Sequence, residues 1–405
     1  MKVLHVLSGR VASGTEGITK NVDGVVAALR ANGHDATLEA HTLELQDLNR
    51  RGVHFRNAWR LRQLLRAPAA ESADIVHVHA NIATMGLAIP KRRAAGASRR
   101  RPTILHVWNA LYVSEEQPRG APLSARLPHA LANGPSLARL ASSRCDAIVV
   151  ASQFQRAQLE QANVTTPVFV VPNGIDGSVY RPADERTREA ARESLRVTGR
   201  PTILYYGHRS YWKGMDTIVD ALPAIQRGMP GAQFLFSTTA YGGAETALRD
   251  KLARNGALPR TRLLGPTNVA TLLAAADVAV FPWPSPVGSA CFPNVLLESM
   301  SAGLAVVATK VGCVPELVES GVSGELVAPR DAPAIAEAVL GLGLDAEKRQ
   351  RIGHAARRVV EERLSWTAVA SRMSKVYDEF GNPAPATAGH VDSSTSAPTS
   401  LPSQG

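Results

Sequence analysis

The chain has 405 residues, of which 45% are hydrophobic and 20% charged, proportions that are ordinary for a globular protein of two or three domains. This composition excludes a fibre, a wholly disordered chain and a small disulfide scaffold, and no apolar run reaches the roughly 18 residues that a membrane-spanning helix needs. The net charge is +10, from 45 basic and 35 acidic residues.

The first half of the chain alternates short apolar runs with stretches long enough to form helices. Six runs are strand candidates, at residues 3–8, 35–41, 74–80, 103–108, 147–152 and 168–172. Most are almost continuously apolar, which is typical of strands buried on both faces of a parallel sheet. The pattern predicts a doubly wound α/β domain over residues 1–178.

Residues 177–200 interrupt this pattern with a charged helical piece between Arg181-Pro182 and Arg200-Pro201. Strand candidates then resume at residues 202–208, 232–238, 261–266, 278–283, 305–310 and 324–329. We expect a second domain of the same class over 197–364, with a ligand cleft between the carboxyl ends of the two sets of strands. A helix is expected over 365–380. The tail 381–405 is mostly Pro, Ala, Ser, Thr and Gly, a composition typical of disorder.

Basic residues are concentrated in one short stretch, Lys91, Arg92, Arg93, Arg99, Arg100 and Arg101. A solvated loop is the simpler interpretation, and an anionic membrane surface is the alternative partner. Aromatic residues do not interleave this cluster, so we expect no nucleic-acid partner. Three widely spaced cysteines, Cys145, Cys291 and Cys313, fit a reduced cytoplasmic compartment.

Gly14 and Gly17 follow the first strand and flank a turn that opens a helix. Glycines at this point allow backbone N–H groups to approach a phosphate, although an ordinary strand-to-helix turn has the same sequence. The spacing is not G-x-G-x-x-G, which argues against a dinucleotide-binding oxidoreductase.

Histidines lie on two of the buried strand candidates. His106 is near the end of its strand, where it could hydrogen-bond a sugar hydroxyl or polarise a leaving group, although a lone strand histidine is more often a core residue. His77 and His79 share one face of another strand but have no third metal ligand at a recognisable spacing, so we expect no metal site. His79, nearer the strand end, could line the cleft.

Two segments of the second domain carry the residues suited to a diphosphate and a ribose. Arg209 and Lys213 stand four apart in a loop that leads into a helix, where two cations could stabilise a departing diphosphate. Pro293-Asn294 begins another helix, on which Glu298 could accept two ribose hydroxyls. Surface cations and a helix-surface glutamate are the simpler alternatives.

Taken together, these motifs resemble the retaining family 4 glycosyltransferases of GT-B fold. The resemblance rests on the glycine loop, DIVHVH, TILHVW, VVPNGID (170–176), GHRSYWKG (207–214) and the run NVLLESMSAGLAVVAT (294–309) with GCVPELVESGVSGELV behind it. It extends over residues 1–380. It implies two Rossmann-like domains with an interdomain cleft, a nucleotide-sugar donor held mostly by the second domain, an acceptor held by the first, and no cofactor.

The resemblance also implies roles for individual residues. His106, Arg209 and Lys213 would be catalytic, with Glu298 on the ribose. The donor site would comprise Gly14, Gly17, His208, Cys291, Phe292, Pro293, Asn294, Val295 and Glu298. Candidates on the acceptor side are His79, Asn109, Glu115 and His129. Such enzymes usually need no divalent metal, and no D-x-D-type motif is evident.

Two positions depart from the family pattern. The first glutamate of a pair separated by seven residues is Ala290 here, and His208 stands where the family typically has arginine. Ala290 favours an altered donor sugar or a non-catalytic, nucleotide-binding homologue. An epimerase or a sugar phosphorylase on the same fold is a further alternative. We expect a cytoplasmic hexosyltransferase that is able to contact a membrane peripherally. UDP-sugar is the expected donor, and GDP-sugars and dTDP-sugars are the next candidates.

Overall fold

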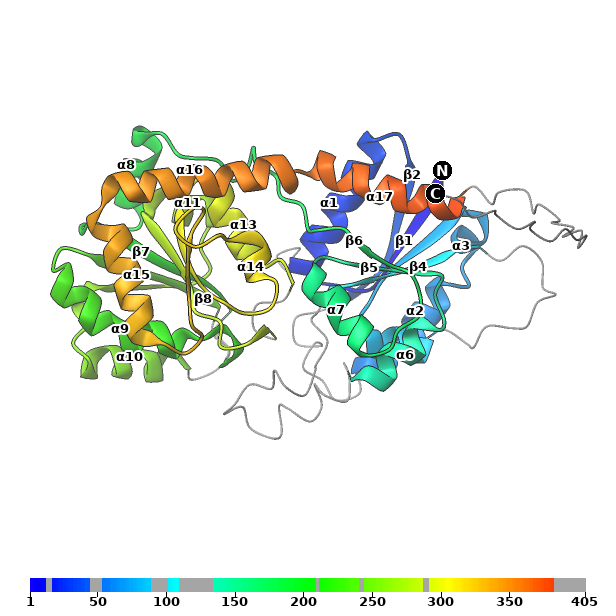
Figure 1. Cartoon of the computed structure of the whole chain (residues 1–405), viewed down its shortest axis with the longest axis horizontal. Coiled ribbons are helices and arrows are strands. Elements are labelled where there is room, and N and C mark those ends of the chain that lie inside the picture. The colour runs from blue at the N-terminus through cyan, green and yellow to red at the C-terminus, as the bar shows by residue number, and fades with distance from the viewer. Residues whose placement is uncertain are drawn as a thin grey trace, which may run out of the picture.

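Two α/β domains lie side by side along the length of the molecule (Figure 1). The computed structural model describes residues 1–11, 17–43, 53–88, 101–108, 134–208, 211–239, 244–286 and 291–381. In this part of the chain, no helix is long and apolar enough to cross a membrane.

The N-terminal domain is built on a six-stranded parallel sheet in the order β2-β1-β3-β4-β5-β6. Its strands are β1 (Lys2–Val11), β2 (Asp35–Leu43), β3 (Ile75–His79), β4 (Thr103–Val107), β5 (Ala147–Val150) and β6 (Val168–Val170). Its helices are α1 (Gly17–Ala31), α2 (Val53–Leu64), α3 (Pro68–Ser72), α4 (Ile82–Ala88), α6 (Pro135–Ser142) and α7 (Gln153–Gln161).

Both faces of this sheet are covered, which is why its strands are apolar on both sides. Leu4 and Val6 pack into the core beneath α2, α4 and α6, whereas Val3 packs on the other face with α1. The alternation follows from the two-residue period of a strand. Three strands of this sheet, β1, β3 and β4, also bring histidines to the α1 face, and these positions are described below.

The C-terminal domain has a second six-stranded parallel sheet, in the order β12-β11-β10-β7-β8-β9. Its strands are β7 (Thr202–His208), β8 (Gln233–Thr239), β9 (Thr261–Leu264), β10 (Val278–Phe281), β11 (Ala305–Thr309) and β12 (Glu325–Val327). Its α-helices are α8 (Glu185–Ser194), α9 (Met215–Gly228), α10 (Ala244–Arg254), α11 (Val269–Ala275), α13 (Asn294–Ser301), α14 (Val314–Leu317), α15 (Ala332–Leu344) and α16 (Ala346–Arg363). Two 3₁₀ turns, η3 (Tyr211–Lys213) and η4 (Leu258–Arg260), complete it.

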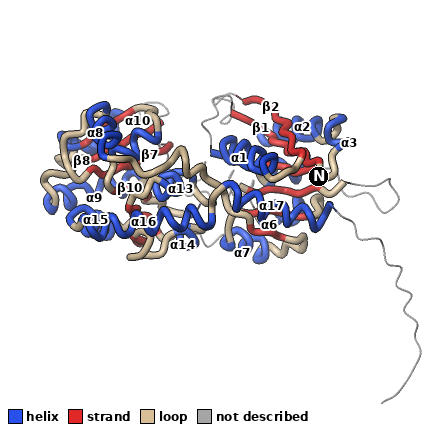
Figure 2. Tube along the Cα trace, turned by 90° about the horizontal axis from the view of Figure 1, so that it is seen from above, coloured by secondary structure: helices blue, strands red, loops and turns tan. Residues whose placement is uncertain are grey.

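The chain crosses between the domains twice, and the two crossings run together. The backbone N–H of Ile175 donates to the Leu364 carbonyl at 2.9 Å. Beyond Leu364, α17 (Trp366–Gly381) packs on α1 and β3 of the N-terminal domain (Figures 1 and 2). The Trp366 ring lies against Gly24 of α1 and Gly174 of the first crossing, so closely that a Cβ at either glycine would overlap it. The return helix is thereby fixed to the first domain.

The predicted fold class is confirmed: all twelve strand candidates form strands, in two parallel sheets covered by helices. The helix expected over 365–380 is α17, which begins at Trp366 and includes Gly381, a residue that the sequence assigned to the tail. Residues 382–405 lie outside the described residues.

Candidate functional site

The strands of the C-terminal sheet reverse their order between β7 and β10, and the candidate site is built at the carboxyl ends of these two strands. Open α/β sheets bind ligands at such a reversal, because the loops that follow adjacent strands run to opposite faces and leave a crevice. Here β7 leads into η3 and α9, and β10 leads towards the segment Cys291–Pro293 and α13.

Glu298 on α13 is the buried carboxylate of this crevice, with 3% of its surface exposed. The Tyr206 hydroxyl at the end of β7 lies 3.2 Å from Glu298 Oε2 and donates to the Val295 carbonyl at 2.7 Å. From the other domain, Lys20 Nζ on α1 approaches Glu298 Oε1 at 3.5 Å. Burial, and then the charge of Glu298, raise the pKa of Tyr206 well above its usual value, so the phenol stays protonated.

The amino end of α13 faces the amino end of α1 across the domain boundary. Asn294 Nδ2 donates to the carbonyl of Gly17, the first residue of α1, at 3.3 Å. Pro293 is the N-cap of α13 and makes no side-chain capping bond. The first N–H groups of a helix carry partial positive charge and have no partner within the helix, so this end suits an anion.

The segment before α13 is held in a strained conformation by contacts from two other elements. Phe292 has φ of 57°, which a non-glycine residue adopts only when the surroundings enforce it. Asn173 in the first crossing donates to the carbonyls of Cys291 (3.2 Å) and Phe292 (2.9 Å). On the other side, the Phe292 N–H donates to Cys313 Sγ at 3.1 Å. These bonds fix the direction of the backbone that enters α13.

Lys213 ends η3, and one residue separates it from α9. The next residue, Gly214, has φ of 71°, and a Cβ there would overlap the Pro282 carbonyl that follows β10. This close approach requires glycine and fixes the loop that carries Lys213 against the end of β10. Burial lowers the pKa of Lys213 to about 8, as expected for an ammonium group that has lost part of its hydration.

Four histidines of the first domain, His5, His77, His79 and His106, form a buried stack on the face of the sheet that α1 and α17 cover. The ring centroids of His106 and Trp108 lie 3.8 Å apart, and His106 also stacks on His77 at 5.4 Å. His79 lies 5.3 Å from His106 by the same measure. Neither ring nitrogen of His106 has a hydrogen-bond partner among the described residues. The structure thus places His106 and His79 inside the domain, and their contact with a ligand stays a prediction.

Hydrogen bonds tie this stack to the return helix. His5 Nδ1 lies 2.9 Å from His79 Nε2, and His77 Nδ1 lies 2.6 Å from the Tyr377 hydroxyl on α17. Burial, and then neighbouring histidines, lower the pKa values of His77, His79 and His106 well below the usual range. The rings are therefore neutral at pH 7. Nitrogens of His5, His77 and His79 lie within 4.8 Å of one another, close enough to share a metal ion, but one pair is already joined by a hydrogen bond.

Several predicted site residues fall outside the described residues. These are Gly14, Asn109, Glu115, His129, Arg209 and Ala290, together with Lys91, Arg92, Arg93, Arg99 and Arg100 of the basic cluster. His208 is described in its backbone, as the last residue of β7. Arg101 is described and exposed.

Three residues that the sequence analysis did not assign belong to the site. Lys20 contacts Glu298 from the opposite domain, Tyr206 contacts Glu298 from β7, and Asn173 holds the segment before α13. Lys20 lies three residues after Gly17 of the glycine loop, and Asn173 lies in VVPNGID, but their partners lie more than 100 residues away. Lys20 and Asn173 reach their partners only because distant parts of the chain pack together. The sequence contains no pattern that would have identified these contacts.

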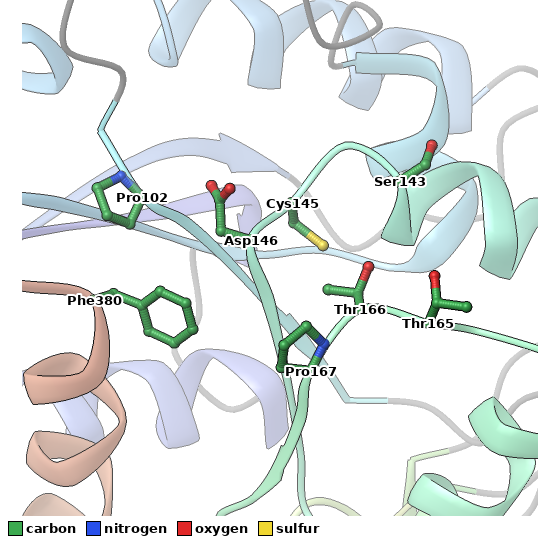
Figure 3. Close-up of a pocket in the computed structure, with 8 residues that line it drawn as sticks. All are labelled: Pro102, Ser143, Cys145, Asp146, Thr165, Thr166, Pro167 and Phe380. Carbon is green, nitrogen blue, oxygen red and sulfur yellow. The ribbon is translucent and has the colours of Figure 1, made fainter. Parts of the chain in front are cut away.

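A cavity of about 680 Å³ lies elsewhere, at the amino ends of β4, β5 and β6 (Figure 3). Pro102, Asp146 and Pro167, which immediately precede these strands, line it, with Phe380 of α17 opposite (Figure 3). Asp146 Oδ2 accepts the N–H of Thr103 at 2.9 Å. Because ligands of such sheets bind at the carboxyl ends, this cavity is separate from the candidate site.

Comparison with known proteins identifies two family profiles that together span both domains. The profile described as "Glycosyltransferase Family 4" matches residues 16–179, and the profile described as "Glycosyl transferases group 1" matches residues 200–345. The glycogen synthase of Mycobacterium tuberculosis is 32% identical over 52% of this chain and 48% of its own length. The spore coat protein SA of Bacillus subtilis is 28% identical over 52% of this chain and 58% of its own.

A GDP-mannose-dependent phosphatidylinositol monomannoside mannosyltransferase of Mycobacterium tuberculosis is 28% identical over 59% of this chain and 63% of its own length. The chain therefore spans about half to two thirds of these relatives. Among solved structures, Anabaena HepE in complex with UDP and glucose aligns with a TM-score of 0.71 at 19% identity, covering 94% of this chain and all of that one. Sucrose-phosphate synthase from Thermosynechococcus elongatus aligns with a TM-score of 0.73, also at 19% identity, covering 94% of this chain and 99% of that one. These likenesses establish the GT-B fold.

Proposed function

Because this chain belongs to the group 1 and family 4 glycosyltransferases, we propose that it transfers a sugar from a nucleotide-diphosphate sugar to an acceptor hydroxyl. The observation that carries the proposal is the meeting of the two domains around α13. Glu298 and Asn294 of that helix contact Lys20 and Gly17 of the first domain. The amino end of a helix, a buried carboxylate and a partly desolvated lysine are thus gathered at one crevice.

We assign the donor to the C-terminal side of this crevice. Arg209, Lys213 and the backbone near Gly17 would hold the diphosphate, and Glu298 would accept the ribose hydroxyls. The N–H groups at the start of α13 would face the sugar, with Cys291 to Val295 shaping the pocket. A ribose at Glu298 competes with Lys20 for the same carboxylate, so donor binding is expected to release or redirect Lys20.

The reaction proposed is transfer with retention of configuration. The bond between the anomeric carbon and the phosphate oxygen breaks, the acceptor oxygen bonds to that carbon from the same face, and the acceptor proton passes to the departing phosphate. Negative charge grows on the diphosphate, where Lys213 and Arg209 would stabilise it. These two side chains supply the positive charge that balances the departing diphosphate, so the proposal needs no divalent ion. Activity should therefore persist in excess EDTA.

The acceptor is proposed to bind the N-terminal domain, with His79, Asn109, Glu115 and His129 as candidates. His106 would act near the sugar as a neutral ring, because its pKa lies far below 7 and neither nitrogen is engaged by a described residue. The relatives named above include a glucan synthase and a lipid mannosyltransferase, so both glycans and lipids belong in an acceptor screen.

A non-catalytic nucleotide-binding homologue is the second candidate, and Ala290 favours it. That position normally carries a glutamate that contacts the transferred sugar, according to the resemblance set out above. Such a homologue would bind a nucleoside diphosphate without consuming any donor. An epimerase would convert donor in the absence of acceptor, and a phosphorylase would require free phosphate.

A thermal-shift panel with UDP, GDP, dTDP and ADP is the first test. A ligand at a hundred times its Kd stabilises the folded state by about 2.7 kcal/mol, which raises the Tm of a chain of this size by a few degrees. We expect UDP to give the largest shift. The Glu298→Gln variant is the matched control, because it keeps the size of the side chain and should lose the shift. No shift from any nucleotide would contradict both candidates.

A further inference from the structure

Helix α2 exposes an arginine-rich face on the N-terminal domain. Trp59 is 62% exposed, which is unusual for so large an apolar side chain. Arg56 and Arg62 are exposed beside it and Arg60 is half-buried, and Arg66 follows the helix in an exposed position. We call these five residues the α2 basic face.

The opposite side of the same helix is part of the core. Ala58 is 5% exposed and Leu61 is fully buried, and both pack in the cluster that α4 and α6 share with the sheet. The orientation of α2 is therefore fixed, and Trp59 points outward because Ala58 and Leu61 point inward. At 3.6 residues per turn, Arg56 and Trp59, three residues apart, lie on one side of the helix.

The net charge of the whole chain comes from the stretch of sequence that contains this helix. Residues 48–114 contain twelve basic and two acidic residues, a surplus equal to the net charge of +10, so the rest of the chain is neutral. Between Arg50 and Ala70 the sequence has no Asp or Glu. The guanidinium groups of Arg56, Arg60, Arg62 and Arg66 make no ion pair or hydrogen bond to a described residue.

We propose that the α2 basic face docks this protein on an anionic lipid surface. Arginine carries a charge that anionic headgroups attract, and tryptophan places an apolar ring with one N–H donor at the boundary between headgroups and acyl chains. A single aromatic ring within a patch of arginines suits a bilayer better than a nucleic acid, which would require several rings on which to stack bases.

This inference goes beyond the proposed transferase activity and does not depend on it. No donor, acceptor or residue of the crevice takes part in the docking. If the transferase proposal holds as well, docking would bring the acceptor-binding domain to acceptors that are anchored in the bilayer.

Co-sedimentation with sucrose-loaded vesicles tests the proposal. The full chain is mixed with phosphatidylcholine vesicles, with or without one quarter phosphatidylglycerol, at low and at high salt. Binding is expected only to the anionic vesicles, and it should weaken as salt screens the charges. Replacing Arg56, Arg60, Arg62 and Arg66 by glutamine should reduce partitioning by about fivefold for each arginine, since each contributes about 1 kcal/mol near such a surface.

The tryptophan is tested separately. Trp59→Ala should lower partitioning several-fold, whereas Trp59→Phe should retain most of it. Brominated lipids should quench the fluorescence of the unmodified protein, and the Trp59→Phe variant should lose most of that quenching. Of the other four tryptophans, Trp108 and Trp283 are 5% and 2% exposed, and Trp212 and Trp366 are half-buried outside α2.

Matched controls come from the C-terminal domain. Leu344→Ala removes another exposed apolar side chain, which is 68% exposed. The triple replacement of Arg227, Arg254 and Arg260 by glutamine removes exposed charge at a distance from α2. Neither control should change vesicle binding, and unchanged thermal melts establish that every variant is folded.

Four outcomes would overturn the proposal. One is the absence of binding to anionic vesicles at low salt, and another is binding that the α2 variants leave unchanged. The third is a dimer in sedimentation velocity that Trp59→Ala dissociates, which would make the face a contact between two copies of the chain. Preferential binding to an oligonucleotide over vesicles at equal charge would likewise assign the face to another partner.

Discussion

Lys20 and Glu298 meet across the domain boundary, with Nζ 3.5 Å from Oε1, although 278 residues separate them in the sequence. The lysine belongs to α1 of the first domain and the glutamate to α13 of the second. The carboxylate is buried and the lysine is 38% exposed in its side chain. The contact therefore joins a carboxylate that has lost its hydration to a cation that keeps much of its own.

Replacing Lys20 by glutamine should destabilise the ligand-free protein modestly. Glu298 would keep Tyr206 but lose its opposite charge, and because Lys20 is partly exposed the expected loss is about 1 kcal/mol rather than the several expected for a fully buried pair. Urea unfolding of both proteins measures it. Lys375→Gln, at an exposed position on α17, is the control and should be neutral. An unchanged free energy of unfolding for Lys20→Gln would show that solvent fully screens the pair.

Lys213→Ala should slow transfer by roughly a hundredfold, or about 3 kcal/mol, if the ammonium stabilises charge on the departing diphosphate. The measurement compares kcat of the variant with that of the unmodified protein at saturating donor. Unchanged turnover would remove Lys213 from the mechanism.

The pH dependence gives an independent test of the same lysine. With a pKa of about 8, Lys213 is mostly protonated at pH 7 and loses its charge as the pH rises. If the charged form is the active one, kcat/KM should decline above about pH 8. Lys213→Arg should move that decline to higher pH, because the guanidinium does not titrate in this range. A profile that is identical in both proteins would assign the alkaline decline to another group.

Acid should destabilise the protein through its buried histidines. Their pKa values in the folded state are lowered, to about 3 for His5, whereas the unfolded chain titrates near 6.5. Below pH 6.5 the unfolded state binds more protons, so stability falls as the pH falls towards the folded pKa. Each histidine that stays neutral would lower the free energy of unfolding by about 1.4 kcal/mol at pH 5.5.

Chemical unfolding at pH 7.5 and at pH 5.5 measures this loss. His79→Asn should reduce the difference between the two values, because the variant lacks one group that the unfolded state can protonate. His354→Asn, at an exposed position on α16, should leave the difference unchanged. Equal free energies of unfolding at both pH values would mean that water or an ion already binds the ring nitrogens of the stacked histidines.

Gly24→Ala should destabilise the protein even though alanine normally favours a helix interior. The added Cβ would overlap the Trp366 ring, and such overpacking costs about 1–3 kcal/mol, more than the roughly 1 kcal/mol gained in helix propensity. Thermal unfolding shows whether the substitution raises or lowers the Tm. Gly265→Ala, where no atom lies within 4 Å of the added Cβ, is the matched control and should have little effect. A rise in Tm for Gly24→Ala would show that α17 can shift freely on α1.

Glu316→Ala should loosen the contact between the domains. The Glu316 carboxylate, from the C-terminal domain, accepts the N–H groups of Gln153 (2.9 Å) and Phe154 (2.8 Å) at the start of α7 in the N-terminal domain. The loss of a cap of this kind costs about 1 kcal/mol. Small-angle scattering should show a larger radius of gyration for the variant without donor, and an unchanged radius would assign the cap a purely local role.

The sequence alone determined the class of fold and the order of its elements. Strands buried on both faces have near-continuous apolar runs, and the run at residues 147–150 is an example in which every side chain is buried. Local turn chemistry also located the start of α13 at Asn294. These features depend on neighbouring residues and on the periodicity of a single strand or helix, so the sequence alone is enough to predict them.

Only the tertiary structure decided which side chains meet. The sequence placed His106 at a strand end, but its strand alternation turns the ring towards Trp108 and the α17 layer. Lys20 gained its role because packing of the two domains brings α1 to α13, a relationship that no local pattern encodes. Contacts between distant segments depend on the docking of whole elements, and a buried carboxylate such as Glu298 acquires its partners only when that docking is complete.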